Sequence, residues 1–129
     1  MRKLEKEIKS EILLSLSKDP SVRLFNQPQG IGYVGRVIEK GAVLVLADWR
    51  VVTFGMAPGS SDLIGWVETE VTEEMIGKVL ARFAAIEVKQ KLGRPTAQQA
   101  NFLRVVLNAG GIAGVARSTD EAWGLIECV

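Results

Sequence analysis

Two short segments contain the residue types that metal-dependent hydrolysis requires. Asp62 stands at the head of an apolar strand, and 25 residues later a second apolar strand contains Glu87, Val88 and Lys89. Side chains at i and i+2 share one face of a strand, so Glu87 and Lys89 point the same way and Val88 points into the opposite layer. If Asp62 lies on a neighbouring strand, two carboxylates and one ammonium converge. Such a set binds a divalent metal ion and activates a water for phosphodiester hydrolysis.

Each of these groups has a distinct role in that chemistry. A hard cation such as Mg²⁺ prefers oxygen ligands, which Asp62, Glu87 and the backbone carbonyl of Val88 supply. Lys89 orients the water or neutralises charge on the scissile phosphate. A bare pattern of this kind is also what a surface ion pair between Glu87 and Lys89 would give. We favour the metal site because the apolar neighbours predict a buried strand, where charges are seldom present for stability.

The composition excludes several other chemistries. The 129-residue chain contains no His, which removes Ser-His-Asp and Cys-His sites and any His-ligated metal. Its single Cys128 allows no internal disulfide, which fits a reducing compartment. No apolar run approaches the ~20 residues of a membrane span, and the charged start lacks the apolar stretch of a signal peptide. We therefore expect a cytoplasmic protein.

The distribution of charge is more informative than the net charge of +1. Between Val88 and Thr119 there is no Asp or Glu, while basic residues stand at Lys89, Lys91, Arg94, Arg104 and Arg117. A basic stretch that begins beside the Glu87 strand can follow a phosphate backbone. Charge alone, however, favours an ordinary solvated surface.

Hydrophobic periodicity and turn residues predict the elements that must position these groups. The order is helix, strands, helix, strand, helix, which indicates a mixed α/β sandwich with a central sheet and helices packed on it, in one domain over residues 1–129. Thr96 is the predicted N-cap of the middle helix. The predicted elements are a helix over 3–17, strands over 22–25, 33–38, 42–46, 50–54, 62–67 and 79–88, a helix over about 97–109, a buried strand over 112–116 and a last helix capped by Ser118.

The segments around these residues resemble the virus-type replication-repair nuclease (VRR-NUC) family. The similarity covers nearly the whole chain in order, and it is greatest to the small stand-alone members found in phages and prophages. The segments that carry it are GSSDLIGW at 59–66, VTEEMIGK at 71–78, FAAIEVK at 83–89, GRPTAQQANF at 93–102 and GGIAGVARS at 110–118.

The resemblance implies the fold of the PD-(D/E)XK nuclease superfamily, a restriction-endonuclease-like core with a central mixed β-sheet flanked by helices. Asp62, Glu87 and Lys89 match the three signature positions, although Ser61 stands where the superfamily name has proline. Gln99 matches the family's glutamine on the following helix, near the active site. Its alternative is a plain amide on the helix surface.

In the first helix, the family carries a glutamate that can complete the metal shell. We assign it to Glu5, which by its spacing shares an inward face with Ile8 and Ile12. Glu7 and Glu11 are the competing choices, and a solvated helix face explains all three equally well.

Four residues are predicted to contact DNA. Arg23 and Asn26 resemble a family segment rich in Arg and Asn near the catalytic groove, with a surface turn as the alternative. Lys91 and Arg94 follow the catalytic strand, and Arg94 at its tip is the better candidate for a phosphate contact.

Two tryptophans, Trp49 and Trp66, are placed where they could stack on bases, but such positions are more typical of core or interface residues.

The family resemblance also implies an activity. We expect a Mg²⁺- or Mn²⁺-dependent endodeoxyribonuclease of a phage or prophage that leaves a 5′-phosphate. Stand-alone members are associated with four-way (Holliday) junctions, and a homodimer would supply two active sites for symmetric cuts. The expected partners are branched DNA and a second copy of the chain, with no membrane and no nucleotide cofactor. The alternatives are a nuclease of flaps, nicks or duplex, and a catalytically silent DNA-binding accessory module.

Overall fold

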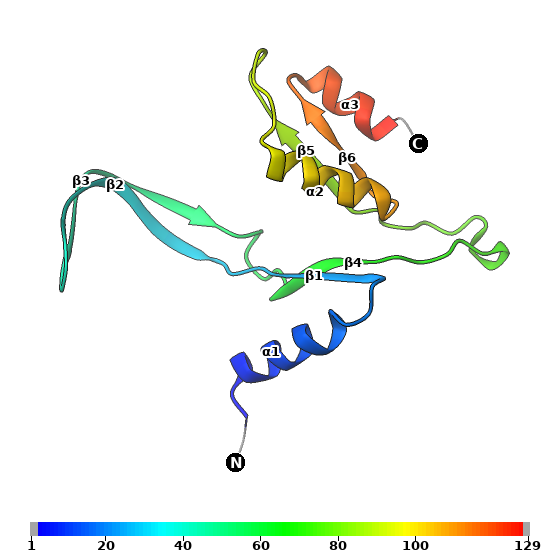
Figure 1. Ribbon diagram of the computed structural model, residues 1–129, viewed down its shortest axis with the longest axis horizontal. Helices are drawn as coiled ribbons and strands as arrows, with labels where there is room; N and C mark the ends of the chain where they lie inside the picture. The colour runs from blue at the N-terminus through cyan, green and yellow to red at the C-terminus, as the bar shows by residue number, and fades with distance from the viewer. Residues whose placement is uncertain (1–2, 128–129) are drawn as a thin grey trace. The chain divides into compact units, whose positions relative to one another are not determined.

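The computed structural model describes residues 3–127, so Cys128 lies outside the described part of the chain (Figure 1). These residues gather into two compact units, one ending at Gly65 and the other beginning at Trp66. No helix of the described residues is long and apolar enough to cross a membrane. The elements are α1 (Glu5–Leu16), β1 (Val22–Asn26), β2 (Gly30–Lys40), β3 (Leu44–Phe54), β4 (Leu63–Val67), the 3-10 helix η1 (Glu73–Met75), β5 (Ala84–Val88), α2 (Ala97–Asn108), β6 (Ile112–Ala116) and α3 (Thr119–Glu127).

In the first unit, α1 is followed by a short turn into β1. The carboxylate of Asp19 accepts hydrogen bonds from the backbone N–H of Ser21 at 2.9 Å and from its hydroxyl at 2.8 Å. These two bonds, the backbone one first, hold the pKa of Asp19 below its usual value. The helix predicted over 3–17 is confirmed. No residue of α1 is buried, so little apolar contact holds the helix to the unit.

The strand that follows Asp62 packs directly against β1. β1 and β4 form a two-stranded sheet. A Cβ added to Gly65 would lie 1.8 Å from the carbonyl oxygen of Arg23, so β4 can approach β1 this closely only with glycine at that position.

β2 and β3 form a long antiparallel hairpin in which Gly30 pairs with Phe54 and Lys40 with Leu44. The sequence predicted a break over residues 47–49, and this is wrong because β3 is continuous there. The break signal reflects a β-bulge instead. Asp48 and Trp49 stand opposite the single residue Gly35, and Asp48 has a φ of 52°, a left-handed conformation that Asp tolerates better than most residues.

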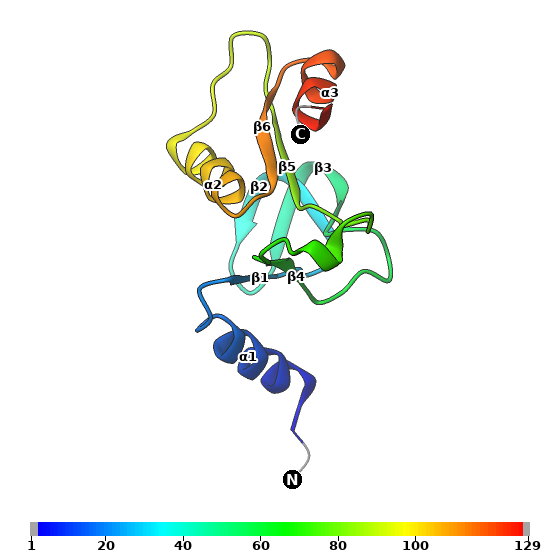
Figure 2. The same ribbon diagram turned by 90° about the vertical axis from the view of Figure 1, so that its right-hand side faces the viewer.

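The second unit is built on a parallel strand pair. β5 pairs with β6 so that Ala84 is opposite Ile112 and Val88 opposite Ala116, and α2 makes the crossover between them. Figure 2 shows α2 and α3 on opposite sides of this pair. The core on the α2 side consists of Leu103, Val106 and Ala113, with Trp66, Phe83, Ala85 and Val115 packed against it.

The mixed α/β class is confirmed, but the described residues do not contain the predicted central sheet. They form three two-stranded sheets, β1–β4, β2–β3 and β5–β6. The strand predicted over 79–88 begins only at Ala84, and Val79 is 98% exposed. No ladder therefore joins β4 to β5 in the part of the chain that is described.

The expectation that the Glu87 strand is buried on both faces is also wrong. On the face away from α2, Ile86 is 36% and Val88 75% exposed. The cause is the position of α3, whose Leu125 packs over Gly114 of β6. The apolar character of β5 thus reflects one covered face and one open face.

Candidate catalytic site

The second unit brings Glu87 and Lys89 together. Lys89 Nζ lies 3.3 Å from Glu87 Oε1, and the two side chains are 22% and 28% exposed, respectively. Glu87 shares its face of β5 with Ala85, which packs against the α2 core. The N–H of Lys89 donates to the carbonyl of Ala116 at 3.1 Å, which ties the pair to the carboxyl end of β6. The carboxylate is therefore held by its surroundings but remains accessible to a ligand.

Gln99 lies in the first turn of α2 and has a local role there. Its N–H donates to the Thr96 hydroxyl at 3.1 Å, and its side-chain Oε1 accepts from the Thr96 N–H at 2.9 Å. The prediction of Thr96 as N-cap is confirmed. Gln99 stands one turn before Leu103, a core residue, so it occupies the α2 face that is turned toward the strands. The capping box accounts for Oε1 and leaves Nε2 as the group that can donate to a ligand.

Asp62 belongs to the first unit, where it is exposed directly before β4. Its carbonyl accepts a hydrogen bond from the N–H of Gln27 at 2.8 Å. The Gln27 side chain continues the contact: Nε2 donates at 3.0 Å to both the hydroxyl of Ser60 and the carbonyl of Ser61, and Oε1 accepts from the Met56 N–H at 2.6 Å. Gln27 therefore holds the loop that carries Asp62.

The sequence alone did not predict this contact of Gln27. Gln27 and Ser60 are 33 residues apart, beyond the reach of any periodicity argument. The one available signal was chemical, since a long amide in the turn and a pair of serines before Asp62 are matching donors and acceptors.

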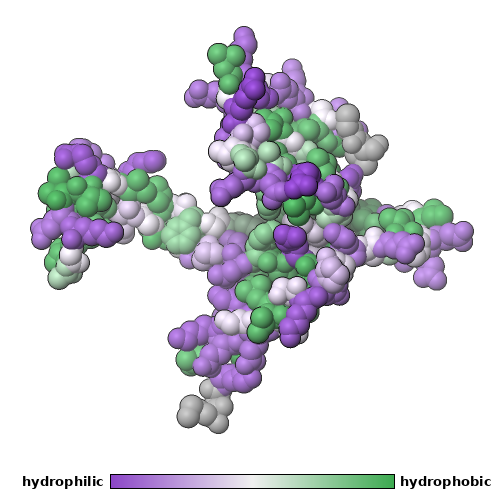
Figure 3. Space-filling model, viewed as in Figure 1, coloured by the Kyte–Doolittle hydropathy of each residue, from purple (hydrophilic) through white to green (hydrophobic). Residues whose placement is uncertain are grey.

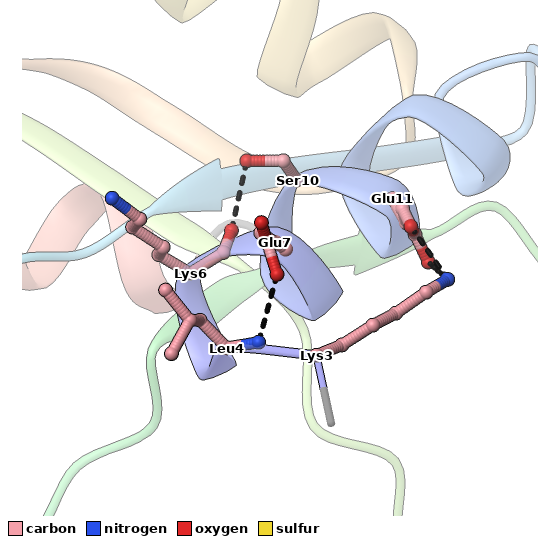
Figure 4. A network of polar contacts seen from close by, with 6 residues as sticks. All are labelled: Lys3, Leu4, Lys6, Glu7, Ser10 and Glu11. Atoms are coloured by element: carbon pink, nitrogen blue, oxygen red, sulfur yellow. Dashed lines mark hydrogen bonds and ion pairs between the residues drawn. The ribbon is translucent and has the colours of Figure 1, made fainter. Parts of the chain in front are cut away.

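The three glutamates of the first helix differ in their contacts, and Figure 4 shows those of Glu7 and Glu11. Glu11 forms an ion pair with Lys3 at 2.7 Å. Glu7 accepts a hydrogen bond from the N–H of Leu4 at 2.8 Å, which caps the start of α1. Glu5 makes no hydrogen bond or ion pair with the described residues. Among the three, Glu5 is thus the one whose carboxylate is not already engaged within the helix.

The reason for choosing Glu5 from the sequence was nevertheless wrong. Ile8 and Ile12, its supposed inward neighbours, are 45% and 40% exposed. The least exposed residues of α1 are Lys9 and Leu13 instead. Glu5 precedes Lys9 and Leu13 at intervals of four, so it shares that less exposed face.

The predicted DNA contacts are exposed in both units. Arg23 and Asn26 lie on β1 in the first unit. Lys91 and Arg94 follow β5 in the second unit. There Arg117, another member of the basic stretch, donates from Nη2 to the Gly93 carbonyl at 2.8 Å.

The two tryptophans have different environments. Trp66 packs in the core of the second unit, with its ring centroid 4.9 Å from that of Phe83. Trp49 is 59% exposed and lies 5.8 Å from Tyr33 in an edge-to-face arrangement. The core interpretation holds for Trp66 and not for Trp49.

The donor set determines which metal ion would fit. Asp62 and Glu87 offer carboxylate oxygens and Val88 offers a peptide carbonyl, which suit Mg²⁺ or Mn²⁺ better than a softer ion. Within neither unit do the described residues gather three Asp, Glu, His or Cys side chains into a metal-binding group. The two carboxylates are divided between the units, Asp62 in the first and Glu87 in the second.

Comparison with known proteins agrees with the donor chemistry. Residues 45–120 match the family model described as the VRR-NUC domain, which is more than half of the chain. The matched segment contains Asp62, Glu87, Lys89 and Gln99, whereas Glu5, Arg23 and Asn26 precede it. No curated protein and no solved structure matches the chain.

Proposed function

The chain belongs to the VRR-NUC family of PD-(D/E)XK-type nucleases, and from this premise we propose that it is a Mg²⁺- or Mn²⁺-dependent DNA endonuclease. The observation that carries the proposal is the half-buried pair of Glu87 and Lys89, 3.3 Å apart, inside the matched segment. A carboxylate and an ammonium held side by side at the end of a strand suit phosphodiester hydrolysis.

In the proposed enzyme, Asp62 and Glu87 would share one active site if β4 and β5 paired as antiparallel neighbours. Support comes from the contact between Trp66 of β4 and Phe83, which directly precedes β5. Asp62 stands four residues before Trp66, and Glu87 four residues after Phe83. Extending an antiparallel ladder from that contact would put Asp62 opposite Glu87, with both side chains on the same face. The same ladder would join β1–β4 to β5–β6 in one restriction-endonuclease-like sheet within a single domain over 1–129.

In the proposed site, the residues have three different roles: metal binding, charge stabilisation and hydrogen-bond donation. Asp62, Glu87 and the Val88 carbonyl would hold the ion, with Glu5 as the candidate from α1. When bound, the ion supplies Lewis acidity that lowers the pKa of a water and offsets charge on the phosphate. Lys89 would stabilise negative charge developing on the scissile phosphate. Gln99 Nε2 would donate to the water or to a phosphate oxygen.

The proposed substrate is a four-way DNA junction, cut by a homodimer. The support for a dimer is one face of the β2–β3 hairpin, where Ile31, Tyr33, Trp49 and Val51 are 65%, 63%, 59% and 52% exposed. Figure 3 shows hydrophobic surface along this arm. An isolated two-stranded sheet is only marginally stable, so a second copy covering this face would stabilise the hairpin. The other contacts to DNA would come from Arg23, Asn26, Lys91 and Arg94.

The test is cleavage of labelled four-way junction, flap, nicked and linear duplex DNA, with Mg²⁺, with Mn²⁺ and with EDTA. Wild type is compared with Lys89→Ala and with Lys78→Ala, which removes an exposed lysine of the same unit. Paired cuts on the junction alone, metal-dependent and lost only in Lys89→Ala, support the proposal. Cutting of flaps or duplex would support the nuclease activity but contradict the four-way junction as the substrate. Binding without cutting under every metal favours the silent accessory module.

A further inference from the structure

A short turn carries the catalytic strand into the predicted DNA contacts. It begins at Lys89 and reaches Arg94, and it is closed by a hydrogen bond from the Gly93 N–H to the Gln90 carbonyl at 2.9 Å. Both ends of the turn are held by the end of β6. The Lys89 N–H donates to the Ala116 carbonyl at 3.1 Å, and Arg117 Nη2 donates to the Gly93 carbonyl at 2.8 Å.

The carbonyl that Arg117 holds belongs to the peptide unit that joins Gly93 to Arg94. This peptide is planar, so the hydrogen bond also orients the backbone nitrogen of Arg94. Arg94 itself is exposed, and glycine before it allows many backbone conformations. Without the bond from Arg117, the direction in which Arg94 leaves the turn would be poorly defined.

Arg117 is in turn held by the start of α3. Its N–H donates to the Glu121 carboxylate at 2.6 Å, and the Glu121 N–H donates to the Ser118 hydroxyl at 3.1 Å. These two bonds are the N-terminal cap of the last helix. The cap of α3 therefore fixes the backbone of Arg117, whose side chain reaches the Gly93 carbonyl.

We propose that Arg117 is a positioning residue, which orients Arg94 toward a DNA phosphate through the Gly93 carbonyl. The role rests on the proposed nuclease function, since it needs DNA as the ligand. One Nη2–H of the guanidinium is engaged with the Gly93 carbonyl. In the proposed role, the contribution of Arg117 to DNA binding passes through Arg94.

A double-mutant cycle separates this role from a direct contact. Junction affinity is measured in EDTA for wild type, Arg94→Ala, Arg117→Ala and the double variant. Each single variant is expected to bind about tenfold more weakly, and the double variant no more than about twofold more weakly than Arg94→Ala, since coupled residues are not additive. Lys78→Ala, which removes an exposed charge of the same unit outside the basic stretch, is the control and is expected to change affinity far less.

A second measurement, made on the protein without DNA, tests whether the bond from Arg117 to the Gly93 carbonyl holds the turn. Amide hydrogen exchange by NMR should show faster exchange at Gly93 in Arg117→Ala. The Ile112 N–H, which donates to the Phe83 carbonyl at 2.8 Å at the opposite end of the strand pair, should be unchanged. Faster exchange confined to the turn, together with the non-additive affinities, supports the inference.

Three results would overturn it, and they differ from one another. If amide exchange at Gly93 is unchanged in Arg117→Ala, the bond from Arg117 does not hold the turn. The nuclease proposal would still stand if wild type cuts DNA. Additive losses of affinity, with the salt slope falling by a further ~0.9 in the double variant, make Arg117 a direct phosphate contact. A wild type that neither binds nor cuts DNA overturns the nuclease proposal, and the role of Arg117 with it.

Discussion

Trp66 and Phe83 pack against each other with ring centroids 4.9 Å apart, and each stands four residues from one carboxylate of the proposed metal site. Both rings belong to the core cluster that α2 covers. If β4 and β5 pair as proposed above, this contact between the two rings would set the register of that pairing.

This register predicts a specific disulfide. In a Cys128→Ser background, Leu63→Cys and Ile86→Cys would be directly opposite and should crosslink on mild oxidation, because opposite Cβ atoms lie close enough for a bond. Mobility on non-reducing gels measures the yield. The control pair is Leu63→Cys with Val88→Cys, which is diagonal in this register although Val88 is 75% exposed. Better crosslinking of the control pair would contradict the register.

Removing either member of the Glu87–Lys89 pair should abolish cleavage while preserving the fold. Glu87→Gln and Lys89→Met keep the size of each side chain, and we expect cleavage to fall at least about 10²-fold in each because an electrostatic group is lost at the phosphate. Calorimetric titration with Mn²⁺ should show weaker binding to Glu87→Gln. Equal Mn²⁺ affinity in wild type and Glu87→Gln would remove Glu87 from the ligand set.

Gln27 should control the loop before Asp62. Gln27→Met retains the length of the side chain and loses its bonds to Met56, Ser60 and Ser61. We expect faster amide exchange at Met56, and a loss of unfolding free energy of about 0.5–1.5 kcal/mol, because the freed groups at Met56 and Ser61 are exposed and can bind water. Gln29→Met, which affects bonds to Ser60 alone, is the control. Exchange at Met56 that is the same in both variants would show that Gln27 does not hold the loop.

Gly65→Ala should destabilise the pairing of β1 with β4. The added Cβ would meet the Arg23 carbonyl oxygen at 1.8 Å, so the strands must separate. The expected cost is about 1–3 kcal/mol, typical of overpacking, measured by urea unfolding. Gly41→Ala is the matched control, since nothing lies within 4 Å of the added atom. A Gly65→Ala variant as stable as Gly41→Ala would show that β4 does not approach β1 so closely.

A charge on the exposed face of the hairpin should disrupt the proposed dimer. Trp49→Glu places a carboxylate beside Tyr33 on the apolar face, and sedimentation equilibrium should show dissociation at concentrations where wild type is dimeric. Trp123→Glu is the control, because Trp123 is 60% exposed on α3, in the other unit. If Trp123→Glu dissociates the dimer and Trp49→Glu does not, the interface involves α3.

The sequence predicted those features that depend on neighbouring residues. Thr96 and Gln99 form the expected capping box because their spacing alone brings the groups together. The sequence predicted a break at 47–49 where the structure has a β-bulge, because turns and bulges both use residues such as Asp48 that tolerate a left-handed conformation. The stretch at 79–83 has the composition of a strand, but a strand also needs a hydrogen-bonded neighbour, which composition does not provide.

In the candidate site, too, the features that depend on local sequence were predicted and those that depend on distant partners were not. Residue type and spacing single out Asp62, Glu87 and Lys89 as candidates, and the structure brings Glu87 and Lys89 together. Gln27 and Arg117 act through carbonyls that are distant in sequence, and a carbonyl is present at every residue. Nothing in the residue types identifies the Gly93 carbonyl as the partner of Arg117, and for Gln27 the only signal is the pair of serines before Asp62.

The capping role of Gln99 has a consequence for how this position varies. Glutamate at this position would accept the hydrogen bond from the Thr96 N–H as well as glutamine does. Helix stability alone therefore does not favour one of these two residues over the other. Only glutamine also carries an amide donor. We therefore expect Gln99→Glu to leave the start of α2 stable and, in the proposed site, to lower cleavage by removing the Nε2 donor.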